Sequence, residues 1–371
     1  MWKLYCSIYM KIFNTKGDVK MKERNLQLDI LKIMACFAVV VIHVTGIITF
    51  NMRSKYLINH TLYYLSGFAV PIFFIVNGYF QLNREKVKYT YAMKKIGNIL
   101  AVVFVWNLIV FLLSRIVTNK FLMDLLLSKK TTNPFSMTLN SLIQRNYFWQ
   151  FWFFGSLIII YAVLPLLHKC FISNKRAIVI TGIFIVCCLV IDSISISRSL
   201  DKKPIIQIGV IQTLRLWTWF AYFLLGGLLG RTKIREYILN KISGKLNIFI
   251  FVISSIIISA YQYNMAHKYY RAISIEFFYD NIFTFIWVIS LFLLIYRHKL
   301  EIRSGKFIGL VSDKIMGIYI IHVTVLNVST HFYKFNTPVS NILLIFIVAA
   351  ISLILTLIIS KIPIVNRLIR I

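Results

Sequence analysis

The sequence predicts an all-α integral membrane protein, a polytopic bundle of about ten helices that cross a lipid bilayer. Hydrophobic residues make up 59% and aromatic residues 15% of the 371 residues, which is more than in a soluble globular chain. Apolar runs of roughly 18 residues or more recur from end to end, and a helix of that length crosses the hydrocarbon core. The short segments between the runs are rich in lysine and arginine. No segment has the composition of a separate soluble domain.

Each expected span is one apolar run, bounded by polar or basic residues. The longest break, 115–146, separates the third span from the fourth, and the other breaks are short. In chain order, the expected spans are 28–50, 61–82, 97–114, 147–167, 177–196, 211–230, 246–262, 279–296, 307–328 and 339–360.

The distribution of basic residues predicts the orientation of the spans. Of the 42 lysines and arginines, 26 lie in the N-terminal segment and the segments on its side, 13 lie on the opposite side, and 3 lie within spans. Because positively charged loops stay in the cytoplasm, we expect a multi-pass protein of the cell membrane with both termini cytoplasmic. Topology and contact with membrane lipids then explain the net charge of +30, and we expect no nucleic-acid partner.

Two further features concern domain organisation and metal binding. The five cysteines show no CxxC spacing and no nearby histidine at metal-ligand spacing, so we expect neither a metal site nor a disulfide framework. Residues 1–20 are too short and interrupted for a span, and they carry no small-residue cleavage site. Met21 to Arg24 then reads like a second start. We expect a dispensable extension at 1–20 and one membrane domain at 21–371.

One stripe of the first expected span carries three ionisable residues. Lys32 and His43 are eleven residues apart, which at about 100° per residue returns to within roughly 20° of the same helix face. By the same measure Asp29 lies about 40° from His43. Ionisable groups in hydrocarbon cost several kcal/mol each and are usually kept for transport or chemistry. This stripe is the strongest functional signal in the chain.

A second histidine, His322, falls in the ninth expected span. His43 and His322 each lie about four or five residues past the middle of a span that runs from inside to outside, which places both roughly 6–8 Å outward of the bilayer midplane. Equal depth indicates that the two imidazoles face one cavity. The alternative is that each histidine is hydrogen-bonded to a neighbouring helix as part of the packing.

Five segments, in order, carry a resemblance to a known family. They are the Asp29, Lys32 and His43 pattern, PIFFIVNGYF (71–80), FWQFWFFGSLIIIYAVLPLL (148–167), YFLLGGLLG (222–230) and GIYIIH (317–322). Together they resemble the membrane-bound acyltransferase 3 family over nearly the whole chain. Two positions depart from it, because Lys32 stands where the family has arginine and Asn77 where it has serine. Lysine keeps the charge but loses the bidentate fork of arginine.

The resemblance implies transfer of an acyl group, most often acetyl, from a cytoplasmic acyl-CoA to a hydroxyl of a cell-surface polysaccharide or lipid-linked sugar. By matching position His43 is the expected catalytic histidine, with His322 as a second catalytic candidate. A neutral imidazole can take the proton of a sugar hydroxyl or carry the acyl group briefly. The donor substrate is then acetyl-CoA or another acyl-CoA, and no bound cofactor is expected.

Other candidate residues lie toward the cytoplasmic end, where the donor enters. Lys32 is about 16 Å nearer the cytoplasm than the imidazole, which suits the thioester or phosphate end of the donor. Asp29 is placed to hold Lys32, and Asn77 is expected at similar depth. Lys94 and Lys95 belong to a basic segment that either binds the CoA phosphates or serves topology and lipid contact.

Toward the outer side, Trp152 and Arg215 are candidates for contact with the acceptor. Aromatic and basic residues at this depth are also typical of membrane interfaces, which is the simpler interpretation. Glu276 and Asp280 flank the eighth expected span. We expect them to be solvated loop ends, with a role as second base as the alternative.

Two other classes of protein remain open. A transporter or flippase of glycan intermediates or acyl donors would also bury polar residues around a cavity, although neither internal repeats nor paired Gly and Pro interruptions support it. A membrane sensor or binding domain is the third possibility. For the transferase, we expect no fused soluble domain, so the protein completes transfer itself or hands the acyl group to a separate extracytoplasmic partner.

Overall fold

The computed structural model describes residues 24–51, 57–116, 133–271, 273–298, 302–333 and 337–362, together with 366 and 369. Within these ranges the chain is built of helices and contains no strand. The predicted all-α membrane bundle is therefore confirmed. The expected N-terminal extension at 1–20 lies outside the described residues.

Helices cover most of each predicted span, but the spans predicted at 61–82 and 307–328 are each divided between two helices. The main helices are α2 (Leu26–Asn51), α3 (Leu57–Leu65), α4 (Ala69–Leu82), α5 (Tyr89–Ile116), α7 (Pro134–Leu142), α8 (Trp152–Ala162), α9 (Leu164–Cys170), α10 (Asn174–Leu200), α12 (Leu216–Leu229), α13 (Thr232–Lys241), α14 (Gly244–Asn264), α15 (Ile282–Arg297), α16 (Ile302–Ser312), α17 (Ile315–Phe332) and α18 (Pro338–Ile359). Shorter elements connect them: η1 (Trp149–Phe151), α11 (Ile206–Gly209), η2 (Gln212–Leu214), η3 (Met265–Tyr270) and η4 (Ile275–Phe278).

Every predicted span corresponds to a helical segment, but not all ten segments have the length of a span. Among the described residues, seven segments are long and apolar enough to cross a membrane, and an eighth is the pair α8–α9, bent by 59°. The bend follows from Pro165 in the first turn of α9, which cannot donate a backbone hydrogen bond. The other two, α12 and α15, are apolar but shorter. Much of α12 is buried among other helices, where a short helix need not reach both membrane surfaces.

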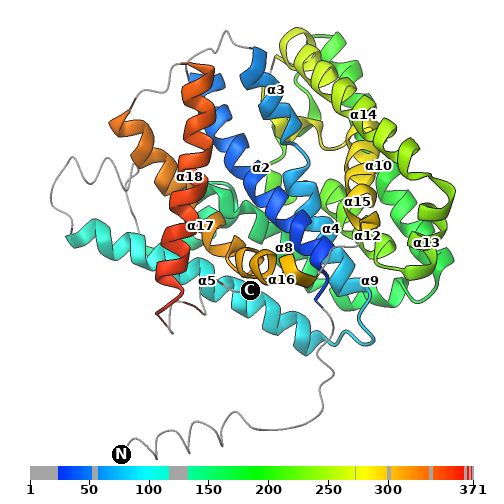
Figure 1. Ribbon diagram of the computed structural model, residues 1–371, viewed down its shortest axis with the longest axis horizontal. Coiled ribbons are helices and arrows are strands. Elements are labelled where there is room, and N and C mark those ends of the chain that lie inside the picture. Colours follow the sequence, from blue (N-terminus) through cyan, green and yellow to red (C-terminus); the bar gives the residue numbers. More distant parts are fainter. Residues whose placement is uncertain are drawn as a thin grey trace, which may run out of the picture.

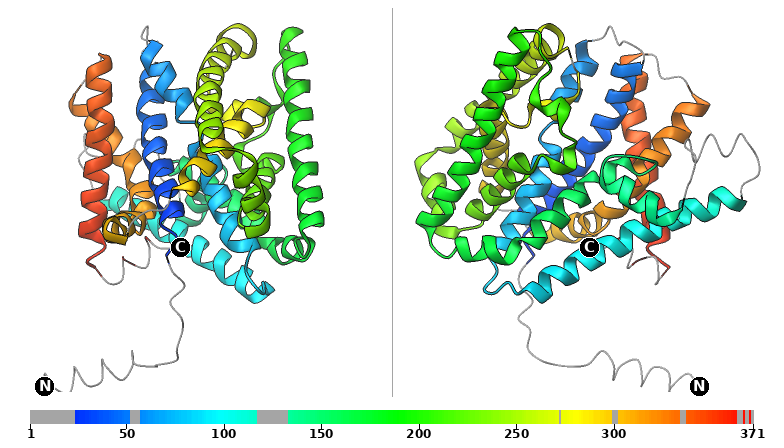
Figure 2. Two further views of the ribbon diagram at one scale, coloured as in Figure 1. Left: turned by 45° about the vertical axis from the view of Figure 1, so that its right-hand side comes forward. Right: turned by 180° about the vertical axis from the view of Figure 1, so that it is seen from behind.

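The helices form two flanks with α2 between them. Figures 1 and 2 show α10 and α14 on one flank, α17 and α18 on the other, and α2 between them. The long helix α5 runs obliquely across the bundle near the end where α2 begins (Figure 1). Short elements fill the space between the flanks, and they supply most of the polar residues of the site described below.

Helices α4 and α12 pack with their backbones in direct contact. A Cβ atom added at Gly78 would lie 1.7 Å from the carbonyl oxygen of Phe223, and one added at Gly226 would lie 2.0 Å from that of Ile75. Small residues allow such close approach between membrane helices. Gly78 lies in PIFFIVNGYF (71–80) and Gly226 in YFLLGGLLG (222–230), two of the segments that carry the family resemblance.

We expect Gly226→Ala to lower the stability of the protein. The added methyl group must push α4 away, and overpacking of this kind costs about 1–3 kcal/mol. Gly182→Ala on α10 is the matched control, because a Cβ atom there meets nothing within 4 Å. Thermal unfolding in detergent should show a lower midpoint for Gly226→Ala and no loss for Gly182→Ala. Equal midpoints would contradict the close packing of α4 on α12.

Candidate active site

A cavity of about 280 Å³ lies between the two flanks. It is mostly apolar, with a few polar groups from segments far apart in the sequence, as is usual for a ligand site. Its walls come from α2, α3, α4, η1, α8, η2, η4 and α17, and the lining residues are Val39, Ile42, His43, Gly46, Tyr63, Val70, Phe73, Trp149, Gln150, Trp152, Phe153, Gln212, Ser274, Ile275, Glu276, Tyr279 and Tyr319.

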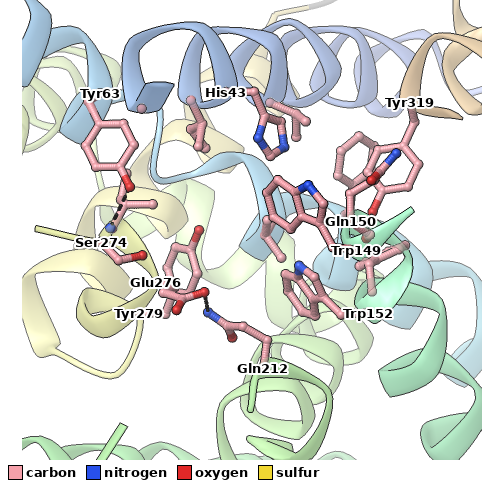
Figure 3. A pocket seen from close by; sticks show the side chains of 17 residues that line it. His43, Tyr63, Trp149, Gln150, Trp152, Gln212, Ser274, Glu276, Tyr279 and Tyr319 are labelled. Carbon is pink, nitrogen blue, oxygen red and sulfur yellow. Dashed lines mark hydrogen bonds between the residues drawn. The ribbon is translucent and has the colours of Figure 1, made fainter. Parts of the chain in front are cut away.

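His43 lies on the cavity wall and is packed between two other rings. Its imidazole and the Trp149 ring form a T-shaped pair, with ring centroids 5.0 Å apart and the planes at 79°. The ring of His322 lies 5.0 Å away, centroid to centroid. The two imidazoles are therefore neighbours, but only His43 lines the cavity, and His322 is fully buried beside it, so the expectation that both face one cavity is not met. Figure 3 shows the His43 imidazole pointing from α2 toward Trp149.

Hydrogen bonds of His322 define which of its nitrogens is basic. Its Nδ1 lies 2.8 Å from the carbonyl oxygen of Tyr319 and 3.2 Å from that of Ile318. Because a carbonyl oxygen only accepts, Nδ1 carries the proton and Nε2 is left with a lone pair. Nε2 has no hydrogen-bond partner among the described residues. A basic nitrogen beside His43 can accept a hydrogen bond from that imidazole and orient it.

Gln150 is a buried cavity residue that the sequence analysis missed. Only 2% of the residue is exposed, and neither Oε1 nor Nε2 has a partner within the described parts of the chain. The 3-10 turn η1 is fixed at this point, because the Tyr319 hydroxyl donates to the backbone carbonyl of Gln150. A buried amide without partners costs about 1–3 kcal/mol per group. Such an amide on a cavity wall is placed to bind a polar ligand atom.

Glu276 also lines the cavity, which corrects the expectation of a solvated loop end. Its Oε2 accepts hydrogen bonds from Nε2 of Gln212 at 2.7 Å and from Nε2 of Gln144 at 3.2 Å. Arg215 lies 3.8 Å from its Oε1. Nothing in the local sequence indicates this position, because the cavity wall forms only when η4 folds against η2.

Asp280 is likewise buried, but it does not line the cavity. It accepts hydrogen bonds from the hydroxyl of Thr218, from the indole of Trp217 at 3.2 Å and from Gln207 at 3.3 Å. The expectation of a solvated position was wrong here too. With its oxygens satisfied by neighbouring helices, Asp280 ties the start of α15 to α12.

Of the two expected acceptor residues, only Trp152 lines the cavity. The guanidinium of Arg215 is buried and donates to the backbone carbonyls of Val210, Glu276 and Gln207. Its contacts in the structure join η4 to the segment before α12. Buried in this way, Arg215 is not placed to contact an acceptor directly.

The expected donor residues lie outside the cavity. Asp29 does hold Lys32, with Nζ 2.6 Å from Oδ1, and it also bonds Arg24 and Ser312. This cluster joins the start of α2 to the end of α16, and Figure 1 shows α16 beside the start of α2.

The other three expected donor residues are spread over α4 and α5. The amide of Asn77 donates to Phe73 on its own helix and accepts from the hydroxyl of Tyr161, at 2.9 Å each. Lys94 is exposed and Lys95 half-buried. None of these three residues, nor Asp29 or Lys32, lines the cavity. Their part in donor binding remains a prediction.

A family model described as an acyltransferase domain matches residues 25–361. The chain belongs to the acyltransferase 3 family. No curated protein and no solved structure gives a significant match.

In this membrane acyltransferase, the segments that carry the family resemblance meet at the cavity. The first span supplies His43, the FWQFWFF segment supplies Trp149, Gln150 and Trp152, and GIYIIH supplies Tyr319 to the cavity and His322 behind His43. Another pair of these segments forms the close contact between α4 and α12.

Proposed function

We propose that this acyltransferase moves an acyl group, most simply acetyl, from a cytoplasmic acyl-CoA to a hydroxyl of a cell-surface polysaccharide or lipid-linked sugar, and that it does so in the cell membrane. One observation carries the proposal. His43 lines a cavity inside the bundle, and its ring packs on a second imidazole whose Nε2 is free to accept a hydrogen bond.

The chemistry assigns a role to each nitrogen of His43. We assign one nitrogen of His43 to a hydrogen bond with His322 in the reacting state, which leaves the other nitrogen facing the cavity as a base. It takes the hydroxyl proton of the acceptor while the hydroxyl oxygen bonds to the thioester carbonyl carbon. The C–S bond then breaks, and the imidazolium returns the proton to the departing CoA sulfur. The same nitrogen could instead attack first and carry the acyl group to the acceptor.

Gln150 supports the same reaction as a hydrogen-bond donor. When the carbonyl carbon becomes tetrahedral, negative charge develops on its oxygen, and a donor fixed in advance stabilises that charge. The unpartnered Nε2 of Gln150 lies in the cavity wall beside Tyr319 (Figure 3). Tyr319 is one turn before His322 on α17, nearer the predicted cytoplasmic side from which the donor comes.

A reconstituted system tests transfer against transport. The protein is placed in liposomes, with acetyl-CoA labelled in the acetyl group outside, and with glycan extracted from cells that lack the protein. We expect label to enter the glycan in an alkali-labile bond and an equal amount of free CoA thiol to appear. A flippase would instead deliver intact acetyl-CoA or glycan across the membrane without releasing thiol, and that result would reject the proposal.

A further inference from the structure

The wall of the cavity opposite Gln150 carries a fixed carboxylate. Figure 3 shows Glu276 beside Tyr279 and Gln212, on the other side of Trp149 from Gln150. The side chain of Glu276 is 25% exposed and lines the cavity. Its segment, 274–279, follows the predicted outer end of α14, so this wall faces the side from which an extracytoplasmic acceptor arrives.

Two glutamines hold the carboxylate in one position. Gln212 and Gln144 both donate to Oε2, while Oε1 has only the Arg215 guanidinium at 3.8 Å, which is beyond hydrogen-bond distance. Gln212 is itself fixed, because its backbone N–H donates to Gln144 and its carbonyl accepts from the indole of Trp219 at 2.7 Å. Oε1 of Glu276 therefore keeps capacity to accept a further hydrogen bond.

Gln212 provides a second, independent sign of a ligand. It is fully buried and lines the cavity, and its Oε1 has no hydrogen-bond partner among the described residues. The wall thus offers two kinds of spare acceptor, a carboxylate oxygen and an amide oxygen. Two indoles, Trp149 and Trp152, add flat apolar surface beside it.

From this wall we infer the chemical class of the acceptor. We propose that Glu276 and Gln212 bind hydrogen-bond donors of the acceptor sugar, hydroxyl or ammonium groups, and that the acylated sugar carries no carboxylate or phosphate of its own. A hydroxyl or ammonium group donates to both oxygens. An anionic group would face the Glu276 carboxylate, whose neighbouring guanidinium, that of Arg215, is already engaged by backbone carbonyls, and like charges repel at this range. The indoles suit the apolar face of a neutral or amino sugar ring.

This inference rests on the proposed function, and one experiment separates the two. Envelope glycan from cells that carry the wild-type protein, and from cells that lack it, is fragmented, and tandem mass spectrometry assigns each protein-dependent ester to its sugar. We expect the ester on a neutral or amino sugar, and the assignment itself tells which. An ester on a uronic acid or phosphorylated sugar would overturn the inference but leave the transferase standing. No protein-dependent ester at all would overturn the proposed function.

Variants of Glu276 then test the wall directly. Glu276→Gln keeps the shape and removes the charge, and we expect it to reduce the ester about tenfold at equal protein abundance. Glu276→Asp keeps the charge, so it should restore part of the level, which a merely structural role for the side chain's length would not predict. Glu236→Gln, at an exposed position on α13, is the matched control and should change nothing. A full ester level with Glu276→Gln would contradict the inference.

Discussion

Replacement of His43 by glutamine should abolish most of the acyl transfer, by a factor of about 10²–10⁴, because glutamine keeps polarity and bulk but cannot take a proton. The Michaelis constant for acyl-CoA should change little, since the expected donor residues lie elsewhere on the chain. The measurement is the rate of CoA thiol release by the reconstituted protein in the presence of glycan. Undiminished thiol release would exclude His43 as the base.

The neighbouring histidine provides a graded comparison. We expect His322→Gln to lower the same rate by a smaller factor, on the order of 10²-fold at most, because His322 orients the base but does not contact the reactants. His298→Gln, at an exposed position, should have no effect. If His322→Gln lost more activity than His43→Gln, the roles assigned to the two rings would be reversed.

Replacement of Gln150 by leucine should separate activity from stability. Leucine fills a similar volume but removes a buried amide without partners, so the free energy of unfolding should rise by about 1–3 kcal/mol. The turnover rate should fall by about 10²–10³-fold, as expected for loss of one donor to a developing oxyanion. The two measurements are thermal unfolding in detergent and thiol release under saturating acyl-CoA.

A matched control lies on α18, away from the cavity. Asn341 is also buried, with both side-chain polar atoms unpartnered among the described residues. Asn341→Leu should raise stability in the same way and leave turnover unchanged. If Gln150→Leu kept full turnover, Gln150 would be an ordinary buried residue and the oxyanion role would be wrong.

Much of the fold was predictable because a bilayer demands long apolar runs. Helix covers most of every predicted span, although those at 61–82 and 307–328 are each divided between two helices. The span predicted at 147–167 is broken because Pro165 cannot continue the hydrogen-bond ladder. The span predicted at 211–230 starts later, since Arg215 has a non-helical backbone and its guanidinium is engaged by carbonyls before α12.

The site was predictable only where residues share a helix or a depth. Helical spacing paired Asp29 with Lys32, and equal depth in two spans brought His43 to His322. Gln150 and Glu276 gave no such signal. They belong to short elements that leave the regular helical pattern, and their place in the cavity wall depends on contacts between segments that lie far apart in the chain.

The most direct test of the account measures alkali-labile acyl esters on envelope glycans by mass spectrometry. Three strains are compared: one that lacks the protein, one with the wild type, and one with His43→Ala at equal membrane abundance. The account predicts an ester of defined mass in the wild-type strain only, and that mass identifies the acyl group. Identical esters in all three strains would contradict it, because the protein would then not acylate the glycan.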